Sequence, residues 1–273
     1  MAPATTGVRH PKGPAEPSTG PAAGAFLRTY LDSSVGAKIT VGLTGLGLVG
    51  FVFFHMIGNL KILPGGPDSR EAINAYAHFL KHDLGAWLWI ARGGLLTIFV
   101  LHLFLAVRLA LRSRAARPVK YAYARTAQAG VASRTMMWTG VVIGLFTLFH
   151  LAHYTFAWVK RAEVPDPATG QLVSMNYLDL RDAKGRHDVY EMTVAGFTNV
   201  PIAVLYLVSQ VILFAHLRHG IPSTFQTLGI KNATFRGSID RLGLALALVI
   251  LAGNCALVLA VQLGYVTTQY RTV

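Results

Sequence analysis

Charged residues are scarce in this sequence, and the scarcity decides its class. Asp, Glu, Lys and Arg make up 14% of the 273 residues, whereas hydrophobic residues make up 53%. Because a soluble domain carries about 25% charged residues, this composition is typical of an integral membrane protein. Cysteine is rarer still. Cys255 is the only one, which excludes a disulfide framework, an iron–sulfur site and a CxxCH haem attachment within the chain.

Acidic residues are also few, which leaves a formal charge of +13. Such an excess can indicate a nucleic-acid partner, but in a membrane chain the positive-inside rule explains it, so no nucleic acid is expected. Residues 1–30 are predicted to form a disordered cytoplasmic tail, because the first 25 are rich in Pro, Ala and Gly and contain no apolar core. The missing core also excludes a signal peptide.

Long apolar runs are what the chain has instead. A bilayer core of roughly 30 Å needs about 20 mostly apolar residues per helix, and five runs qualify: 39–63, 84–111, 135–159, 200–217 and 242–266. We therefore predict an all-α bundle of five transmembrane helices over residues 31–273, in which the fourth and shortest begins before Val200. The outer loop 160–198 is long for a structureless connector, so we expect it to cap the outer face with structure of its own.

Basic residues gather in two of the connections between these runs. They are Arg112, Arg114, Arg117, Lys120, Arg125 and Arg134 after the second run, and Arg218, Lys231, Arg236 and Arg241 after the fourth. Most acidic residues lie in the other connections. The positive-inside rule therefore places the N-terminus and the basic connections in the cytoplasm and the C-terminus outside.

Histidine is the ionisable residue that recurs within or at the end of the apolar runs. Six of the ten histidines lie there: His55, His102, His150, His153, His216 and His219. A single intramembrane histidine can simply hydrogen-bond a neighbouring helix. Ionisable groups are costly inside a membrane, however, so their recurrence in four of five runs indicates a functional role.

Depth sorts four of these histidines into two pairs. His55 lies eight residues before the outer end of the first run, roughly 12 Å deep at about 1.5 Å per residue, and His150 lies at almost the same level in the third. His102 and His216 lie near the inner ends of the second and fourth runs. Two facing imidazoles are the axial ligands of a six-coordinate haem, so we predict two non-covalent haem b groups stacked across the membrane.

His153 and His219 follow His150 and His216 by one helical turn, so only one of each couple need bind iron. His150 and His216 match the depth of their partners better and are assigned as ligands. His153 and His219 are candidates for hydrogen bonds to haem propionates, or are polar interface residues. Zinc would need three or four ligands at one level.

Four motifs resemble the cytochrome b membrane anchor of succinate:quinone oxidoreductases, the succinate dehydrogenase and fumarate reductase family. They are HMIGNL at 55–60, NAYAHF at 74–79, RPVKYA at 117–122, and HLRHG with FQTLG within 216–229. The chain is similar to the bacterial anchors with one subunit, five helices and two haems. The resemblance implies haem ligation by His55, His102, His150 and His216, and a place in the bacterial cytoplasmic membrane.

The resemblance also implies partners. An iron–sulfur subunit would lie against the cytoplasmic side and connect to a flavoprotein, where succinate and fumarate interconvert. The chain would hold no residue catalytic for that step. Quinone chemistry would take place in this chain near the outer haem, with menaquinone as the implied quinone.

Residues at the outer edge of the membrane are the candidates for the quinone site. They are Glu71, Tyr76, His78 and His82, although a solvated interfacial segment would look the same. Arg92 lies deep enough in the second run to need a partner, and a propionate of the outer haem would serve. Arg134 is expected to meet a propionate of the inner haem or to act only in topology.

Two other functions stay open at this stage. One is a free-standing transmembrane cytochrome b that carries electrons without a dehydrogenase. The other is a haem-free transporter whose histidines bind substrate or protons.

Overall fold

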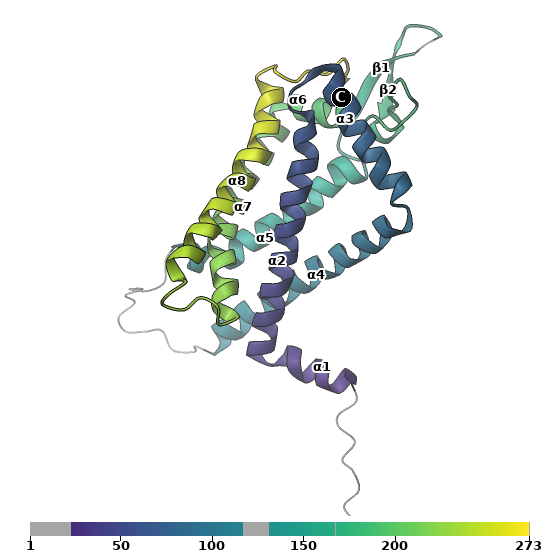
Figure 1. Ribbon diagram of the computed structural model, residues 1–273. Coiled ribbons are helices and arrows are strands. Elements are labelled where there is room, and N and C mark those ends of the chain that lie inside the picture. The colour runs from purple at the N-terminus through teal and green to yellow at the C-terminus, as the bar shows by residue number, and fades with distance from the viewer. Residues whose placement is uncertain (1–22, 117–130, 167, 273) are drawn as a thin grey trace, which may run out of the picture.

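The five apolar runs form five long helices. The computed structural model describes residues 23–116, 131–166 and 168–272, most of them helical (Figure 1). In these ranges, five helices are long and apolar enough to cross a membrane: α2 (Ser34–Asn59), α4 (Ala86–Ala115), α5 (Val131–His150), α7 (Val200–Thr227) and α8 (Arg236–Gln262). Two short helices, η1 (Leu60–Ile62) and η3 (Leu151–Thr155), prolong α2 and α5. The prediction of five helices long and apolar enough to cross a membrane is confirmed.

The fourth long helix begins at Val200 and not before it, so that prediction is wrong. Asn199 caps α7 by accepting a hydrogen bond from the Ile202 amide at 3.2 Å. Pro201 stands in the first turn, where its fixed φ and missing N–H suit a helix start. The helix instead continues past its predicted end, because the charge of Arg218 ends the apolar run without ending the helical backbone.

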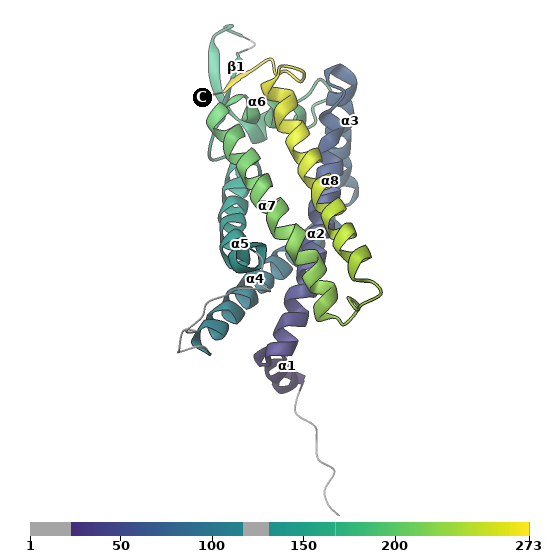
Figure 2. The same cartoon turned by 90° about the vertical axis from the view of Figure 1, so that its left-hand side faces the viewer.

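α2 lies in the middle of the bundle and packs against three of the other long helices (Figures 1 and 2). α7 and α8 lie side by side, and glycines of α8 allow close approach to α7 and α2. A Cβ on Gly243 would lie 2.8 Å from the ring of Pro222, and a Cβ on Gly253 would lie 2.3 Å from the sulfur of Met56. α4 packs on α2 but buries only Leu105 fully, so most of its surface is not covered by protein.

A set of short elements closes one end of the bundle, and we call it the cap. It consists of α3 (Gly66–His78), η2 (Phe79–Asp83), β1 (Arg161–Pro165), β2 (Leu172–Asn176), η4 (Tyr177–Asp179), α6 (Val189–Thr198) and β3 (Arg271–Thr272). The strands form an antiparallel sheet in the order β2-β1-β3. The expected structure in the 160–198 loop is confirmed, whereas the all-α prediction omits this sheet.

Asp188 is the polar centre of the cap and is fully buried. Its carboxylate accepts hydrogen bonds from Arg70 Nε at 3.0 Å, from Asn74 Nδ2 at 3.0 Å and from the Glu191 amide at 3.1 Å. The last of these bonds caps α6. Arg70 also contacts the buried carboxyl of Glu191 at 3.3 Å, and burial raises the pKa of Glu191. These bonds tie α3 to α6.

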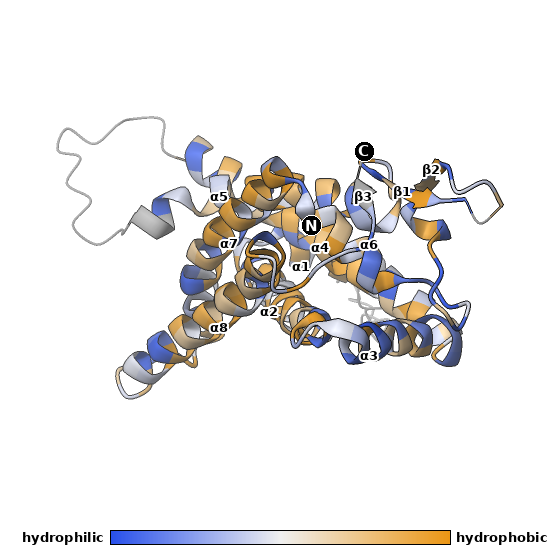
Figure 3. Ribbon diagram, turned by 90° about the horizontal axis from the view of Figure 1, so that it is seen from above, coloured by the Kyte–Doolittle hydropathy of each residue, from blue (hydrophilic) through white to orange (hydrophobic). Residues whose placement is uncertain are grey.

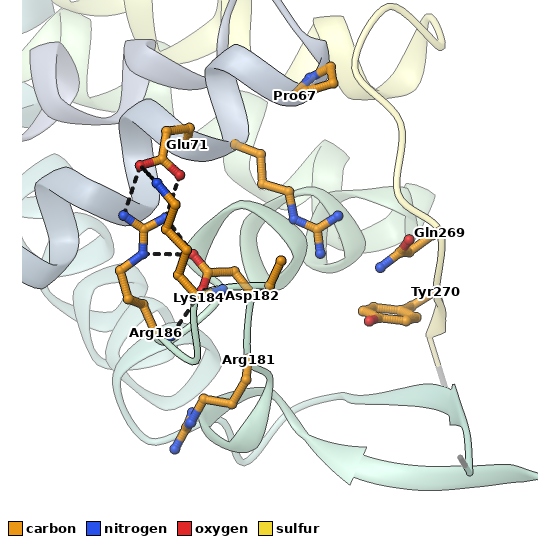
Figure 4. Close-up of a pocket in the computed structure, with 10 residues that line it drawn as sticks. Pro67, Glu71, Arg181, Asp182, Lys184, Arg186, Gln269 and Tyr270 are labelled. Atoms are coloured by element: carbon orange, nitrogen blue, oxygen red, sulfur yellow. Dashed lines mark hydrogen bonds and ion pairs between the residues drawn. The ribbon is translucent and has the colours of Figure 1, made fainter.

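Glu71 makes a second connection between α3 and the rest of the cap. Its carboxylate lies 2.6 Å from Arg186 Nη2 and 2.9 Å from Lys184 Nζ. Figure 4 shows this cluster on one side of a pocket of about 470 Å³, with Gln269 and Tyr270 on the other. Hydrogen bonds from Arg186 and Lys184 lower the pKa of Glu71 from 4.5 to about 2.

This lowered pKa predicts how acid weakens the cap. A carboxyl whose pKa is depressed by folding stabilises the fold fully above its unfolded value and loses that contribution as the pH falls through the folded value. We therefore expect pepsin to cleave the cap faster as the pH falls from 4.5 to about 2. The Glu71→Gln variant should lack this part of the pH dependence, and equal pH profiles for the two proteins would contradict the assignment.

The opposite end carries α1 (Ala23–Asp32), which lies within the predicted disordered tail. The tail prediction is wrong for residues 23–30, because α4 holds this helix: Arg108 donates to the Leu31 carbonyl at 3.1 Å and pairs with Asp32, and Arg112 donates to the Asp32 carbonyl at 2.8 Å. Residues 1–22 and the RPVKYA motif lie outside the described ranges. Figure 3 shows apolar residues along the long helices and hydrophilic ones on α3 and the cap loops.

Candidate haem centre

His102 on α4 faces α2 where α2 has a glycine. A Cβ on Gly45 would lie 3.0 Å from His102 Cε1, so only glycine leaves the ring in its present place. The Nδ1 atom of His102 lies 3.0 Å from the Val41 carbonyl and 3.3 Å from the Thr44 hydroxyl. The Thr44 hydroxyl itself donates to the Thr40 carbonyl at 2.7 Å.

These partners fix the tautomer of His102. The Val41 carbonyl can only accept, and the Thr44 hydroxyl has its hydrogen committed elsewhere, so Nδ1 must carry the ring proton. The Nε2 atom is then left with a free lone pair. It has no hydrogen-bond partner in the described part of the chain, and the ring is only half-buried. A neutral imidazole of this kind is ready to bind a metal.

His216 on α7 repeats this arrangement. Its Nδ1 lies 3.1 Å from the Thr139 hydroxyl, which is placed 3.0 Å from the Met136 carbonyl and donates to it. With the Thr139 hydrogen on the Met136 carbonyl, Nδ1 of His216 donates to the Thr139 oxygen, and Nε2 has no hydrogen-bond partner among the described residues. A Cβ on Gly140 would lie 3.3 Å from its ring.

The predicted pair of His55 and His150 lies together. The rings of His55 on α2 and His150 on α5 have centroids 5.9 Å apart and are nearly perpendicular, at 87°. The Asn59 amide nitrogen lies 3.1 Å from His55 Nε2 and donates to it, so this nitrogen is unprotonated and its lone pair accepts the Asn59 hydrogen. The His55 ring stacks on Phe51 and remains exposed, so protein atoms leave room beside it.

His153 is placed differently from its neighbour His150. It is fully buried, and its Nδ1 lies 3.0 Å from the Tyr206 hydroxyl, which is also 3.2 Å from His150 Nδ1. His153 has no surface left for an iron, which favours His150 as the ligand of this pair. His219 bonds Ser223 one turn further along its own helix, at 3.2 Å. The suggested propionate contacts of His153 and His219 stay predictions.

The two arginines expected at propionates lie on the surface. Arg92 sits over the ring of Trp89, with its guanidinium carbon 4.9 Å from the centroid, and Arg134 stands near the start of α5. Neither makes an ion pair with another described residue. Their predicted role is untested.

The four candidate quinone residues do not form one group. Glu71 points into the cap and is held by Arg186 and Lys184. His78 and His82 are exposed, and their rings stack with centroids 4.2 Å apart. Tyr76 alone turns toward the bundle. Its ring would lie 2.8 Å from a Cβ on Gly58, one turn from His55.

The partners of the histidines were not foreseen from the sequence. Tyr206, Thr139 and Asn59 each carry a polar group within an apolar run, which is the one signal that could have marked them. Which of them meets a histidine depends on how each helix is rotated about its axis, and composition does not reveal that.

The donor set fits haem better than a bare metal ion. Within the described ranges, no three His, Cys, Asp or Glu side chains lie close enough to hold a metal ion together, whereas two imidazoles suffice for a haem iron whose other ligands come from the porphyrin. Comparison with known proteins found no matching family model, no similar curated protein and no similar solved structure.

Proposed function

We propose that this chain is the membrane-anchor cytochrome b subunit of a succinate:quinone oxidoreductase. The observation that carries the proposal is the state of the imidazoles. In His102 and His216, Nδ1 is hydrogen-bonded to a carbonyl or hydroxyl oxygen of a neighbouring helix, and Nε2 has no hydrogen-bond partner among the described residues. Metal-binding histidines are oriented in this way by their second nitrogen.

His102 with His216, and His55 with His150, would hold two haem b groups without covalent bonds. Each bound haem would supply one-electron redox chemistry. The two haems would lie at different depths within the bundle. The protein's part is to fix the four rings. Val41 and Thr139 would do so at one level by accepting Nδ1–H bonds. At the other level Asn59 keeps His55 Nε2 unprotonated, and its N–H would give up this nitrogen when a haem binds.

The charge distribution supports an orientation for the chain in the bacterial cytoplasmic membrane. The end opposite the cap carries Arg112, Arg114, Arg236 and Arg241, which the positive-inside rule places in the cytoplasm. The iron–sulfur subunit would contact that end and connect to the flavoprotein. The cap would then lie outside, with its acidic residues.

A quinone, menaquinone by resemblance, would react on the cap side near His55 and His150. Among the suggested residues Tyr76 is the best placed, because it packs one turn from His55. Glu71 is a poor proton donor there, since Arg186 and Lys184 hold its pKa at about 2. Burial raises the pKa of Glu191, so this cap carboxyl holds a proton more readily than Glu71 does.

The proposal is tested by purifying the tagged chain from membranes. A reduced-minus-oxidised spectrum should show two b haems per chain, and a flavoprotein and an iron–sulfur protein should co-purify. Haem without those partners would favour a free-standing electron carrier. A colourless protein of the right fold would refute both and favour a transporter.

A further inference from the structure

One phenol hydroxyl joins two histidines in the cap-side half of the bundle. Tyr206 is buried on α7, and its hydroxyl lies 3.2 Å from His150 Nδ1 and 3.0 Å from His153 Nδ1. Four aromatic rings surround this junction: Phe146, Phe149, Tyr154 and Phe197. They keep the tyrosine in place and exclude water from the two bonds.

A hydroxyl has one hydrogen, so it can donate to only one of the two nitrogens. In one order, the hydroxyl donates to His150 Nδ1, and His153 donates its own Nδ1–H to the oxygen. In the other order, His150 donates Nδ1–H to the oxygen, and the hydroxyl donates to His153 Nδ1. The direction of the Tyr206 hydrogen thus determines which nitrogen of His150 carries a proton.

Only the second order gives His150 a metal-binding lone pair. When Nδ1 carries the proton, Nε2 is free, as in His102 and His216. His153 must then carry its proton on Nε2, an atom that is buried and lacks a hydrogen-bond partner among the described residues. Because a buried donor without an acceptor is unfavourable, this order is costly in the protein alone and is selected when a ligand binds His150 Nε2.

We infer that Tyr206 is a positioning residue for His150, acting by accepting its Nδ1 proton in the ligand-bound state. The inference rests on the proposed function, since it concerns the iron ligand of the cap-side pair. A hydrogen bond from Nδ1 makes the imidazole a stronger electron donor. The phenol oxygen of Tyr206 therefore stabilises ferric over ferrous iron at this pair.

The test is the midpoint potential of each haem in the purified Tyr206→Phe variant. This change removes one oxygen and keeps the ring that packs between the histidines. The cap-side haem should lose about tenfold of its preference for the ferric state, so its potential should rise by about 59 mV. Its low-spin ferric signal in electron paramagnetic resonance should move as well, while the haem of His102 and His216 keeps its potential.

Tyr154→Phe is the matched control. Tyr154 packs against both histidines in the same cluster, but its hydroxyl donates to the Thr193 carbonyl at 3.2 Å and to no imidazole. This variant should leave both potentials unchanged. A second variant, His153→Phe, removes the acceptor of the Tyr206 hydrogen. It should shift the midpoint potential of the cap-side haem alone.

The outcomes separate this inference from the proposed function. Two haems with an unchanged cap-side potential in Tyr206→Phe would overturn the inference and leave the function standing. Equal shifts in Tyr206→Phe and Tyr154→Phe would overturn it too, because the effect would then come from packing. Wild-type protein without haem would refute the proposed function itself.

Discussion

Replacing His102 by alanine is expected to remove one haem b from the purified protein and to leave the other. His102 presents an Nε2 without a hydrogen-bond partner among the described residues, and it belongs to the predicted pair other than His55 and His150, so the loss should be confined to one haem. A haem with one axial histidine left has lost half of its protein ligands. The pyridine haemochrome assay should fall from two haems per chain to one.

The complementary variant is His55→Ala, which should remove the other haem. His187→Ala serves as the control, because His187 bonds the Tyr177 carbonyl and Lys81 within the cap and belongs to neither pair. If His102→Ala folds poorly, His102→Gly with added imidazole should restore the haem. Survival of both haems in each single variant would show that the ligands are misassigned.

The sequence predicts the spans well because their physics is local. Each needs only a long apolar run, and five such runs became five helices. Helix ends were missed for an equally local reason. The charges around Arg218 and Lys38 end the hydrophobic signal, while the backbone stays helical on both sides of them.

The cap was predicted only in outline. The β1–β2 pairing joins Arg161 to Asn176 across a turn, and a strand contributed by the far end of the chain completes the sheet. Such long-range pairing leaves little trace in a short polar segment. The network around Asp188 is non-local as well, because its partner Arg70 lies in α3, beyond two membrane spans.

The proximity of His55 and His150 could be predicted because depth follows from position along a helix. His55 and His150 were placed at one level by counting residues, and their rings lie 5.9 Å apart. What counting cannot supply is the rotation of each helix. That rotation buries His153 against Tyr206, which adds a second reason to the choice of His150 that depth had already favoured.

Replacing Asp188 by alanine is expected to lower the stability of the cap more than any other single change in its polar network. The carboxylate is fully buried and satisfies Arg70, Asn74 and the first turn of α6 at once. Removing it leaves a partly buried guanidinium without its main partner, which costs about 3–5 kcal/mol. It also removes a helix cap worth about 1 kcal/mol.

The matched control is Asp240→Ala at the other end of the bundle. Asp240 also forms a close ion pair, 2.6 Å from Lys231 Nζ, but half of its side chain is exposed. An exposed pair contributes only about 0–1 kcal/mol, so this variant should unfold near the wild-type temperature. Thermal unfolding in detergent and protease cleavage within 161–198 measure the difference. If the two variants behave alike, the cap is held by its apolar contacts around Tyr177 and Leu180, and the charges at Asp188 are secondary.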